Sequence, residues 1–146
     1  MPQEDAAPLT PVLTMSVVCE NVSTDTRGKV TLHNIIDSLT APIFPAATTQ
    51  LFLVFGFYSP VGSGHILKPT VTISSGDEEP IVSQQLPQDI TFSPSAPQAR
   101  VMIGLGGMVW PHPGEYLVKL ISGKAIKASF PLRVTYPDGT IPEATG

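Results

Sequence analysis

The sequence predicts an all-β fold, a single antiparallel β-sandwich of about eight strands, Ig-like or Greek-key, with Pro-rich tails. Apolar residues recur at every second position in several segments, which is typical of strands with one buried face. No window of a dozen residues keeps the 3.6-residue period of a helix. The 16 prolines are about twice the average usage, and they are scattered along the chain where they would break helices. A small barrel is the alternative architecture.

The length of 146 residues fits one domain. We expect an N-terminal arm over residues 1–10, the β-sandwich over 11–136 and a C-terminal tail over 137–146, because both ends are rich in proline and poor in apolar residues. A domain of this size buries roughly two-thirds of its unfolded surface, so it needs neither a disulfide nor a metal to fold.

The first two strands are expected at residues 12–21 and 29–37, joined by a hairpin turn over 23–28. Gly28 is the residue that the turn would place at positive φ. In the first strand the alternation predicts these inward residues: Leu13, Met15, Val17 and Cys19. In the second strand it predicts Val30, Leu32 and Ile36, with Asn34 as an exception.

The segment 50–59 is apolar at both parities, which indicates a central strand or a second face covered by another element. One parity would enter the core: Leu51, Leu53, Phe55 and Phe57. The other would form an apolar row of Phe52, Val54 and Tyr58. Monomers rarely expose such a row, so either the loop 40–49 or another subunit covers it. We expect the second, with this row as the interface of a homo-oligomer.

Further strands are expected in five segments: 65–74, 81–86, 89–92, 99–108 and 115–122. In 99–108 the inward residues would be Val101, Ile103 and Leu105. The last strand, 124–136, alternates strictly between apolar and polar residues. Pro131 stands on its polar side and cannot donate a ladder hydrogen bond, which predicts an edge strand.

The stretch MVWPHPGEYL, residues 108–117, has the most suggestive chemistry, because His112 and Glu115 lie three residues apart. A shared metal at this spacing needs a helix face, and the two prolines and the glycine around His112 forbid a helix. We therefore expect a tight turn with His112 at its tip. Tyr116 would begin the next inward row and anchor this corner through its hydroxyl.

Other polar groups are isolated in the sequence. His33 shares an outward face with Asp37, a pattern that is usually a solvated contact, and His65 has no evident partner. Cys19, on the predicted buried parity, is expected to be an inert core thiol. The acidic positions, Glu20, Asp25 and the turn 76–79, favour solvated turns over a calcium site because no calcium-loop pattern is present.

The glycine-rich stretch 104–108 does not match a phosphate-binding loop. Glycines in a strand usually mark a bulge or a place where a ring packs closely on the backbone. Four residues could supply that ring: Phe52, Phe55, Phe57 or Trp110.

The charge balance excludes several partners. The net charge is −4 with a pI near 5.2, and no basic stripe is present, so we expect neither nucleic acid nor an anionic membrane as a partner. The single Cys19 excludes an intrachain disulfide and fits a reducing compartment. The N-terminal stretch has no apolar core of a secretory signal, and no apolar run reaches the roughly 20 residues of a membrane helix. We expect a cytoplasmic protein.

Several short motifs resemble those of an uncharacterised bacterial family of small β-sandwich proteins, catalogued as a domain of unknown function. They are CENV (19–22), DTRGK (25–29), IIDSL (35–39), IFP (43–45) and PGEYLVKLISG (113–123). These motifs consist of strand and turn residues. The resemblance therefore implies a β-sandwich and supplies no catalytic residue, cofactor or metal ligand.

The sequence favours a non-enzymatic binding or assembly subunit without a cofactor, whose partner is protein, either itself or a larger assembly such as a phage-like shell or sheath. One alternative is a metal-binding or hydrolytic enzyme that uses His112, Glu115 and loop carboxylates. A second alternative is a carbohydrate-binding module with Trp110 and Tyr58 as its platform. The low aromatic content, 7%, speaks against the second alternative.

Overall fold

A computed structural model of the chain describes residues 11–60, 64–76 and 78–141. The prediction of an all-β fold is confirmed, since these residues contain strands and no helix. The strands are β1 (Val12–Thr24), β2 (Val30–Ile36), β3 (Ser38–Thr40), β4 (Ala46–Ala47), β5 (Gln50–Tyr58), β6 (His65–Ile66), β7 (Thr70–Ser75), β8 (Val82–Gln85), β9 (Ile90–Thr91), β10 (Gln98–Gly106), β11 (Val109–Trp110), β12 (Gly114–Ser122) and β13 (Ala125–Thr135). The predicted arm 1–10, the tail residues 142–146 and Asp77 of the acidic turn lie outside the described residues.

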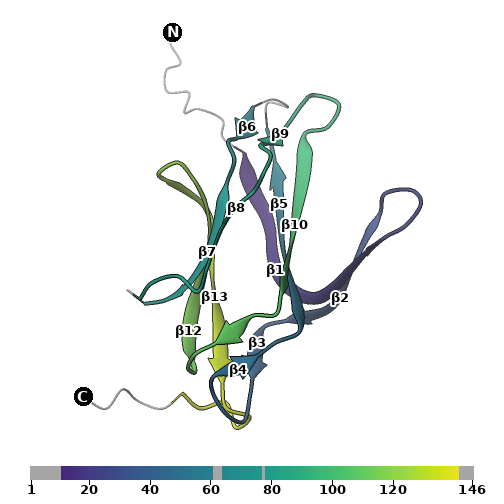
Figure 1. The fold of residues 1–146 in the computed structure, drawn as a ribbon. Coiled ribbons are helices and arrows are strands. Elements are labelled where there is room, and N and C mark those ends of the chain that lie inside the picture. Colours follow the sequence, from purple (N-terminus) through teal and green to yellow (C-terminus); the bar gives the residue numbers. More distant parts are fainter. Residues whose placement is uncertain (1–10, 61–63, 77, 142–146) are drawn as a thin grey trace.

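The strands form two larger sheets that face each other (Figure 1). One sheet has the order β10-β5-β1-β2 and the other has the order β3-β13-β12-β7-β8. Two further pairs, β11-β4 and β6-β9, stand apart from these sheets. The described residues thus hold thirteen strands rather than about eight. The difference comes mainly from two-residue and three-residue strands, which are too short to show an alternation in the sequence.

The hydrophobic core draws on both larger sheets. As predicted, β5 contributes Leu51, Leu53, Phe55 and Phe57, all buried. From the facing sheet come the buried residues Val71, Ile73, Tyr116, Val118, Leu120, Ala128, Leu132 and Val134. The two apolar faces therefore bury each other, and this burial is the main favourable term for folding.

The expected inward face of β1 is wrong for most of the strand. The pairing of β1 with β5 shifts register between Leu13 and Met15, so an extra residue is inserted there. A bulge of this kind reverses the faces of all later residues, because side chains alternate with a period of two. Val18 therefore enters the core, whereas Met15, Val17 and Cys19 turn to the opposite side of the sheet.

The predicted edge position of the last strand is right for only part of β13. Residues Arg133–Thr135 pair with β3 on one side, in parallel, and β12 lines the other side. The parallel pair means that the architecture is not purely antiparallel. Pro131 lies in the part of β13 that pairs with β12 alone among the described strands, which is where a residue without an N–H is tolerated.

Two connections concern the predictions for β2 and β5: the hairpin before β2 and the loop 40–49 before β5. The hairpin between β1 and β2 forms as expected, with Gly28 at φ 79° and the Asp25 carboxylate accepting the N–H groups of Arg27 and Lys29. The loop 40–49 does not lie over the second face of β5. It packs at one end of the core, where the ring of Phe44 meets Tyr136 edge-on.

Candidate functional site

The most distinctive surface is the side of the four-stranded sheet that faces away from the core. Directly opposed residues on antiparallel strands point to the same side of a sheet. Val54 is opposed by Val17 and Met102, and Phe52 is opposed by Cys19 and Gly104. We call the following apolar residues the outer face: Val12, Met15, Val17, Cys19, Ile35, Phe52, Val54, Tyr58 and Met102.

The outer face is closed at its centre and open at its margins. Val54 and Cys19 are both 0% exposed, yet neither belongs to the core cluster between the sheets. Around them Tyr58 and Met102 are each 40% exposed and Ile35 is 57% exposed. The result is an apolar layer around Val54, separated from Tyr58 by Gly56 and the charged Arg100, and monomers seldom leave a large apolar layer in water.

Gly104 explains the geometry at the centre of the outer face. A Cβ built on Gly104 would lie 3.3 Å from Cε1 of Phe52, tighter than ordinary packing. The missing side chain therefore lets the Phe52 ring lie across β10. Phe52 is therefore the ring that packs on the glycine-rich stretch.

The thiol of Cys19 is buried within the outer face rather than in the core. Burial raises the pKa of Cys19, although its Sγ also donates a weak hydrogen bond to the carbonyl oxygen of Asn21 at 3.4 Å. A thiol with a raised pKa holds little thiolate, so it is poorly suited to nucleophilic chemistry.

His112 and Glu115, the pair with the most suggestive spacing, do not meet. Nε2 of His112 lies 3.1 Å from Oε1 of Glu78 in the turn after β7, and its Nδ1 lies 3.1 Å from the carbonyl oxygen of Pro113. Glu115 instead accepts a hydrogen bond from Arg133 at 3.3 Å. Tyr116 donates its hydroxyl hydrogen to the carbonyl oxygen of His112 at 2.6 Å, which closes the corner.

The remaining polar candidates are also separated. His33 pairs with Ser23 at 2.9 Å rather than with Asp37, and Glu20 accepts from the amide of Asn34 at 2.7 Å. His65 lies in the short strand β6. Within the described residues, no group of three or more His, Cys, Asp or Glu side chains is placed to hold a metal ion.

The proposed aromatic platform is excluded by burial. Trp110 is 1% exposed, its Nε1 donates to the hydroxyl of Thr48 at 3.3 Å, and its ring packs edge-on against Tyr116. Trp110 belongs to β11, which pairs with β4 through Ala46 and Ala47. Trp110 therefore cannot form a surface with Tyr58, which lies on the outer face.

The His112 contacts predict a pH dependence of stability. The carbonyl of Pro113 and then the carboxylate of Glu78 raise the pKa of His112 above its usual 6.5. A raised pKa means that the protonated form is favoured by folding, so this stabilisation is complete below the unfolded pKa and disappears as the pH rises through the folded pKa. His112→Ala should therefore lower the melting temperature more at about pH 5.5 than at about pH 8, where the change should be close to zero. An equal shift at both pH values would contradict this assignment.

The fold and the site define a class: an all-β domain with a packed core and a second apolar layer on one sheet. The chain belongs to DUF6941, a family of unknown function, whose model matches residues 14–135. No match was found among the curated proteins. Among the described residues, no helix is long and apolar enough to cross a membrane.

The sequence pattern had identified Phe52, Val54 and Tyr58 but not their companions. The alternation predicts Met15, Val17 and Cys19 in the core, because the bulge in β1 leaves no mark in the sequence. Met102 has the opposite parity to Val101 and Ile103, so the alternation places its side chain on the side of β10 away from the core. That this side continues the row of Phe52 and Val54 follows only from the pairing of β10 with β5.

Proposed function

We propose that this protein is a non-enzymatic assembly subunit that associates with further copies of itself through the outer face. The single observation that carries this proposal is the apolar layer around Val54, with Tyr58 and Met102 40% exposed at its margin. Burying an apolar side chain of this size contributes roughly 1.5–3 kcal/mol, so pairing two such faces provides a substantial driving force. The loop 40–49, the candidate cover from the same chain, lies elsewhere.

The polar residues support association rather than chemistry. Those at the ends of the opposed rows, including Gln50, Gln98 and His33, lie around the apolar residues of the outer face. An apolar centre with a polar rim is the usual anatomy of a protein interface. His112 and Glu115, on which an enzymatic function would depend, each engage a different partner, so no observation favours that alternative.

Two finer assignments belong to the same proposal. We propose that the two larger sheets act as one β-sandwich, with the short pairs β11-β4 and β6-β9 closing its ends. We also propose a cytoplasmic location, which is supported by the free, buried thiol of Cys19. The partner is protein, and the net charge of −4 gives no support for nucleic acid.

Hydroxyl-radical footprinting read by mass spectrometry tests the interface in the wild-type protein. At high micromolar concentration, labelling of Tyr58 and Ile35 should fall several-fold relative to a dilute sample, because association covers the outer face. Leu67 and Ile43, which are 56% and 73% exposed and lie outside the outer face, should label equally at both concentrations. Unchanged labelling of Tyr58 and Ile35 would refute the proposed interface.

A further inference from the structure

A second surface, which adjoins the outer face at Met102, lies along the free edge of the same sheet. Strand β10 spans nine residues and pairs with β5 alone among the described strands. At one end of this ladder the carbonyl of Pro97 accepts the N–H of Ser59, and at the other end the N–H of Gly107 donates to the carbonyl of Thr49. Because bonding alternates along an antiparallel pair, the odd-numbered residues of β10 bond to β5. The even-numbered residues, Gln98, Arg100, Met102, Gly104 and Gly106, therefore direct their N–H and C=O groups away from the sheet.

This edge lacks the protection that the other edges of the described sheets carry. Natural proteins keep sheet edges from pairing by making them short or by adding prolines or irregularities. β3 and β8 have three and four residues, and the open part of β13 contains Pro131. β2 is interrupted by Asn34 at φ 58°. β10 is long and free of proline, and Arg100 is its single charge.

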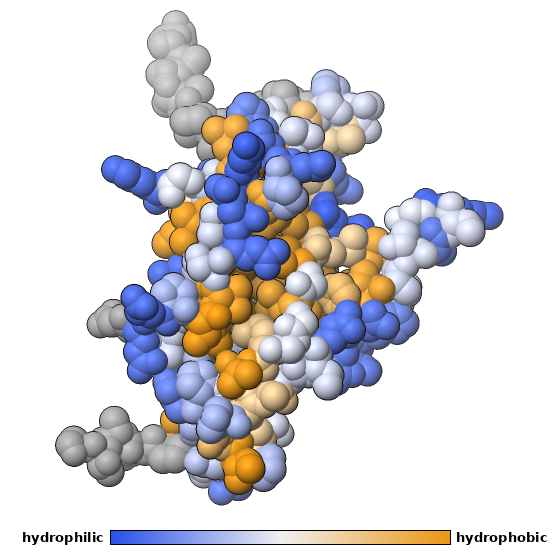
Figure 2. Space-filling view, in the orientation of Figure 1, coloured by the Kyte–Doolittle hydropathy of each residue, from blue (hydrophilic) through white to orange (hydrophobic). Residues whose placement is uncertain are grey.

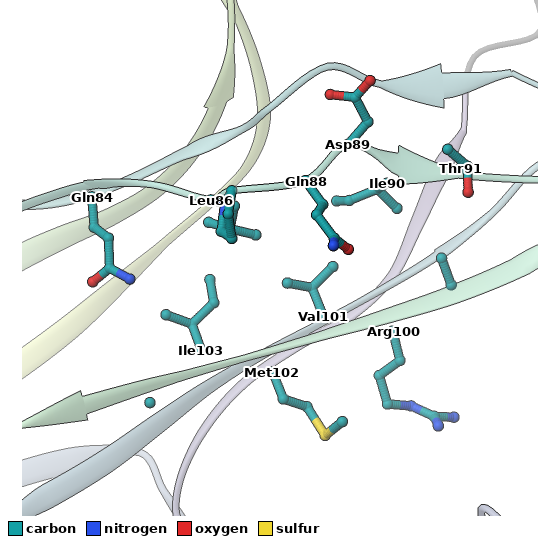
Figure 3. A pocket seen from close by; sticks show the side chains of 13 residues that line it. Gln84, Leu86, Gln88, Asp89, Ile90, Thr91, Arg100, Val101, Met102 and Ile103 are labelled. Atoms are coloured by element: carbon teal, nitrogen blue, oxygen red, sulfur yellow. The ribbon is translucent and has the colours of Figure 1, made fainter.

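A groove of about 500 Å³ lies along β10, between this strand and residues of the segment 84–91. In Figure 3 the side chains of Leu86 and Ile90 point across the groove toward Val101 and Ile103. Figure 2 shows hydrophobic residues gathered between the two larger sheets on the side of the molecule that carries β8 and β10. A strand added to β10 would place every second side chain against Leu86 and Ile90, next to the polar side chains of Gln84, Gln88 and Asp89 that also line the groove.

We propose that the occupant of this edge is β10 of a second copy, paired antiparallel about a two-fold axis at Met102. In this register each outward-directed backbone group finds a partner, because even-numbered residues oppose even-numbered residues. Val101 is then opposed by Ile103 of the second copy, so two apolar side chains meet over the groove. Arg100 is opposed by Gly104, which leaves its side chain space.

Charge and shape favour this register over its neighbours. A two-fold axis at Arg100 would oppose two like charges directly, which is destabilising. With the axis at Met102, the two Arg100 residues are four positions apart, about 13 Å along the strands.

Disulfide trapping of Met102→Cys tests the edge pairing. Residues that exchange both backbone bonds have Cα atoms about 5.5 Å apart, within the range of a disulfide. Mild oxidation should convert most of this variant into covalent dimers, and it should do so equally when Phe52→Glu is added, because Met102 also belongs to the outer face and the second change removes that route to a dimer. The control Ile126→Cys replaces another exposed apolar residue, on β13 in the other sheet, and it should remain uncrosslinked, as should the wild type, whose Cys19 is buried. Absence of a Met102→Cys dimer would overturn the proposal.

The outer-face variant Phe52→Glu separates this proposal from the function proposed above. If both surfaces associate, Phe52→Glu should remain a dimer, and adding Met102→Pro should make it a monomer. Met102 is suited to this change because its N–H is not bonded to β5. A Phe52→Glu monomer would overturn the edge pairing and leave the outer face standing. If Phe52→Glu keeps the wild-type mass and still forms the crosslink when Met102→Cys is added, the proposed edge pairing is supported. The same result would refute the outer face as an assembly interface.

Discussion

Replacing Tyr116 with Ala should lower the free energy of unfolding by about 3–5 kcal/mol, the range for deleting a buried aromatic side chain. Tyr116 is 1% exposed, and its ring packs edge-on against Trp110 at 5.0 Å between centroids. It also stacks on His112 and closes the corner through the 2.6 Å hydrogen bond to the His112 carbonyl. The variant therefore loses apolar contacts and leaves the partly buried His112 carbonyl with one partner fewer.

Two comparison variants separate these contributions. Tyr116→Phe keeps the ring and removes the hydroxyl, so it should cost about 1–3 kcal/mol, the penalty for a buried group that loses its hydrogen bond. His112→Ala should have a small effect near neutral pH, because the His112 side chain is 41% exposed. Urea unfolding at one pH measures all three. Equally small effects at Tyr116 and His112 would contradict the role of Tyr116 as an anchor.

Much of the β5 environment could be predicted from the sequence. The alternation predicts Leu53 and Phe55 in the core and Phe52 and Val54 on the opposite side of the sheet, and the structure confirms the placement of both pairs. This worked because β5 is regular and apolar on both sides, so its faces depend only on parity. The hairpin at Gly28 was equally local, since it depends on one residue that tolerates positive φ.

What the sequence could not predict depends on insertions and on distant partners. The bulge between Leu13 and Met15 leaves no local mark, because the apolar alternation simply continues through it while the faces exchange. The contact between Glu78 and His112 joins residues that are 34 positions apart, and only the packing of the corner brings them together. The candidate site itself spans four strands, whose order is a property of the whole fold.

Phe52→Glu should disrupt the proposed assembly while each chain stays folded. Phe52 lies on the outer face beside Gly104 and outside the core cluster, so a carboxylate there can reach water in a separated chain. In an assembly that pairs two outer faces, the same carboxylate would be buried in an apolar layer without a partner. Burial of an unpaired charge is strongly unfavourable, and this penalty should exceed the gain from the remaining contacts.

Ile126→Glu is the matched control for this change. Ile126 is 57% exposed on β13, in the sheet that does not carry the outer face. It undergoes the same change from an apolar side chain to a carboxylate, so it reports any general effect of added negative charge. It should keep the wild-type state of association.

The most direct test is the molar mass of the three proteins, measured by size-exclusion chromatography with light scattering at high micromolar concentration. The wild type and Ile126→Glu should have the same mass, a multiple of the 15.5 kDa chain, and Phe52→Glu should have at most half of it, with an unchanged circular dichroism spectrum. A wild-type mass of 15.5 kDa, or a Phe52→Glu mass equal to that of the wild type, would contradict the outer face as an assembly interface.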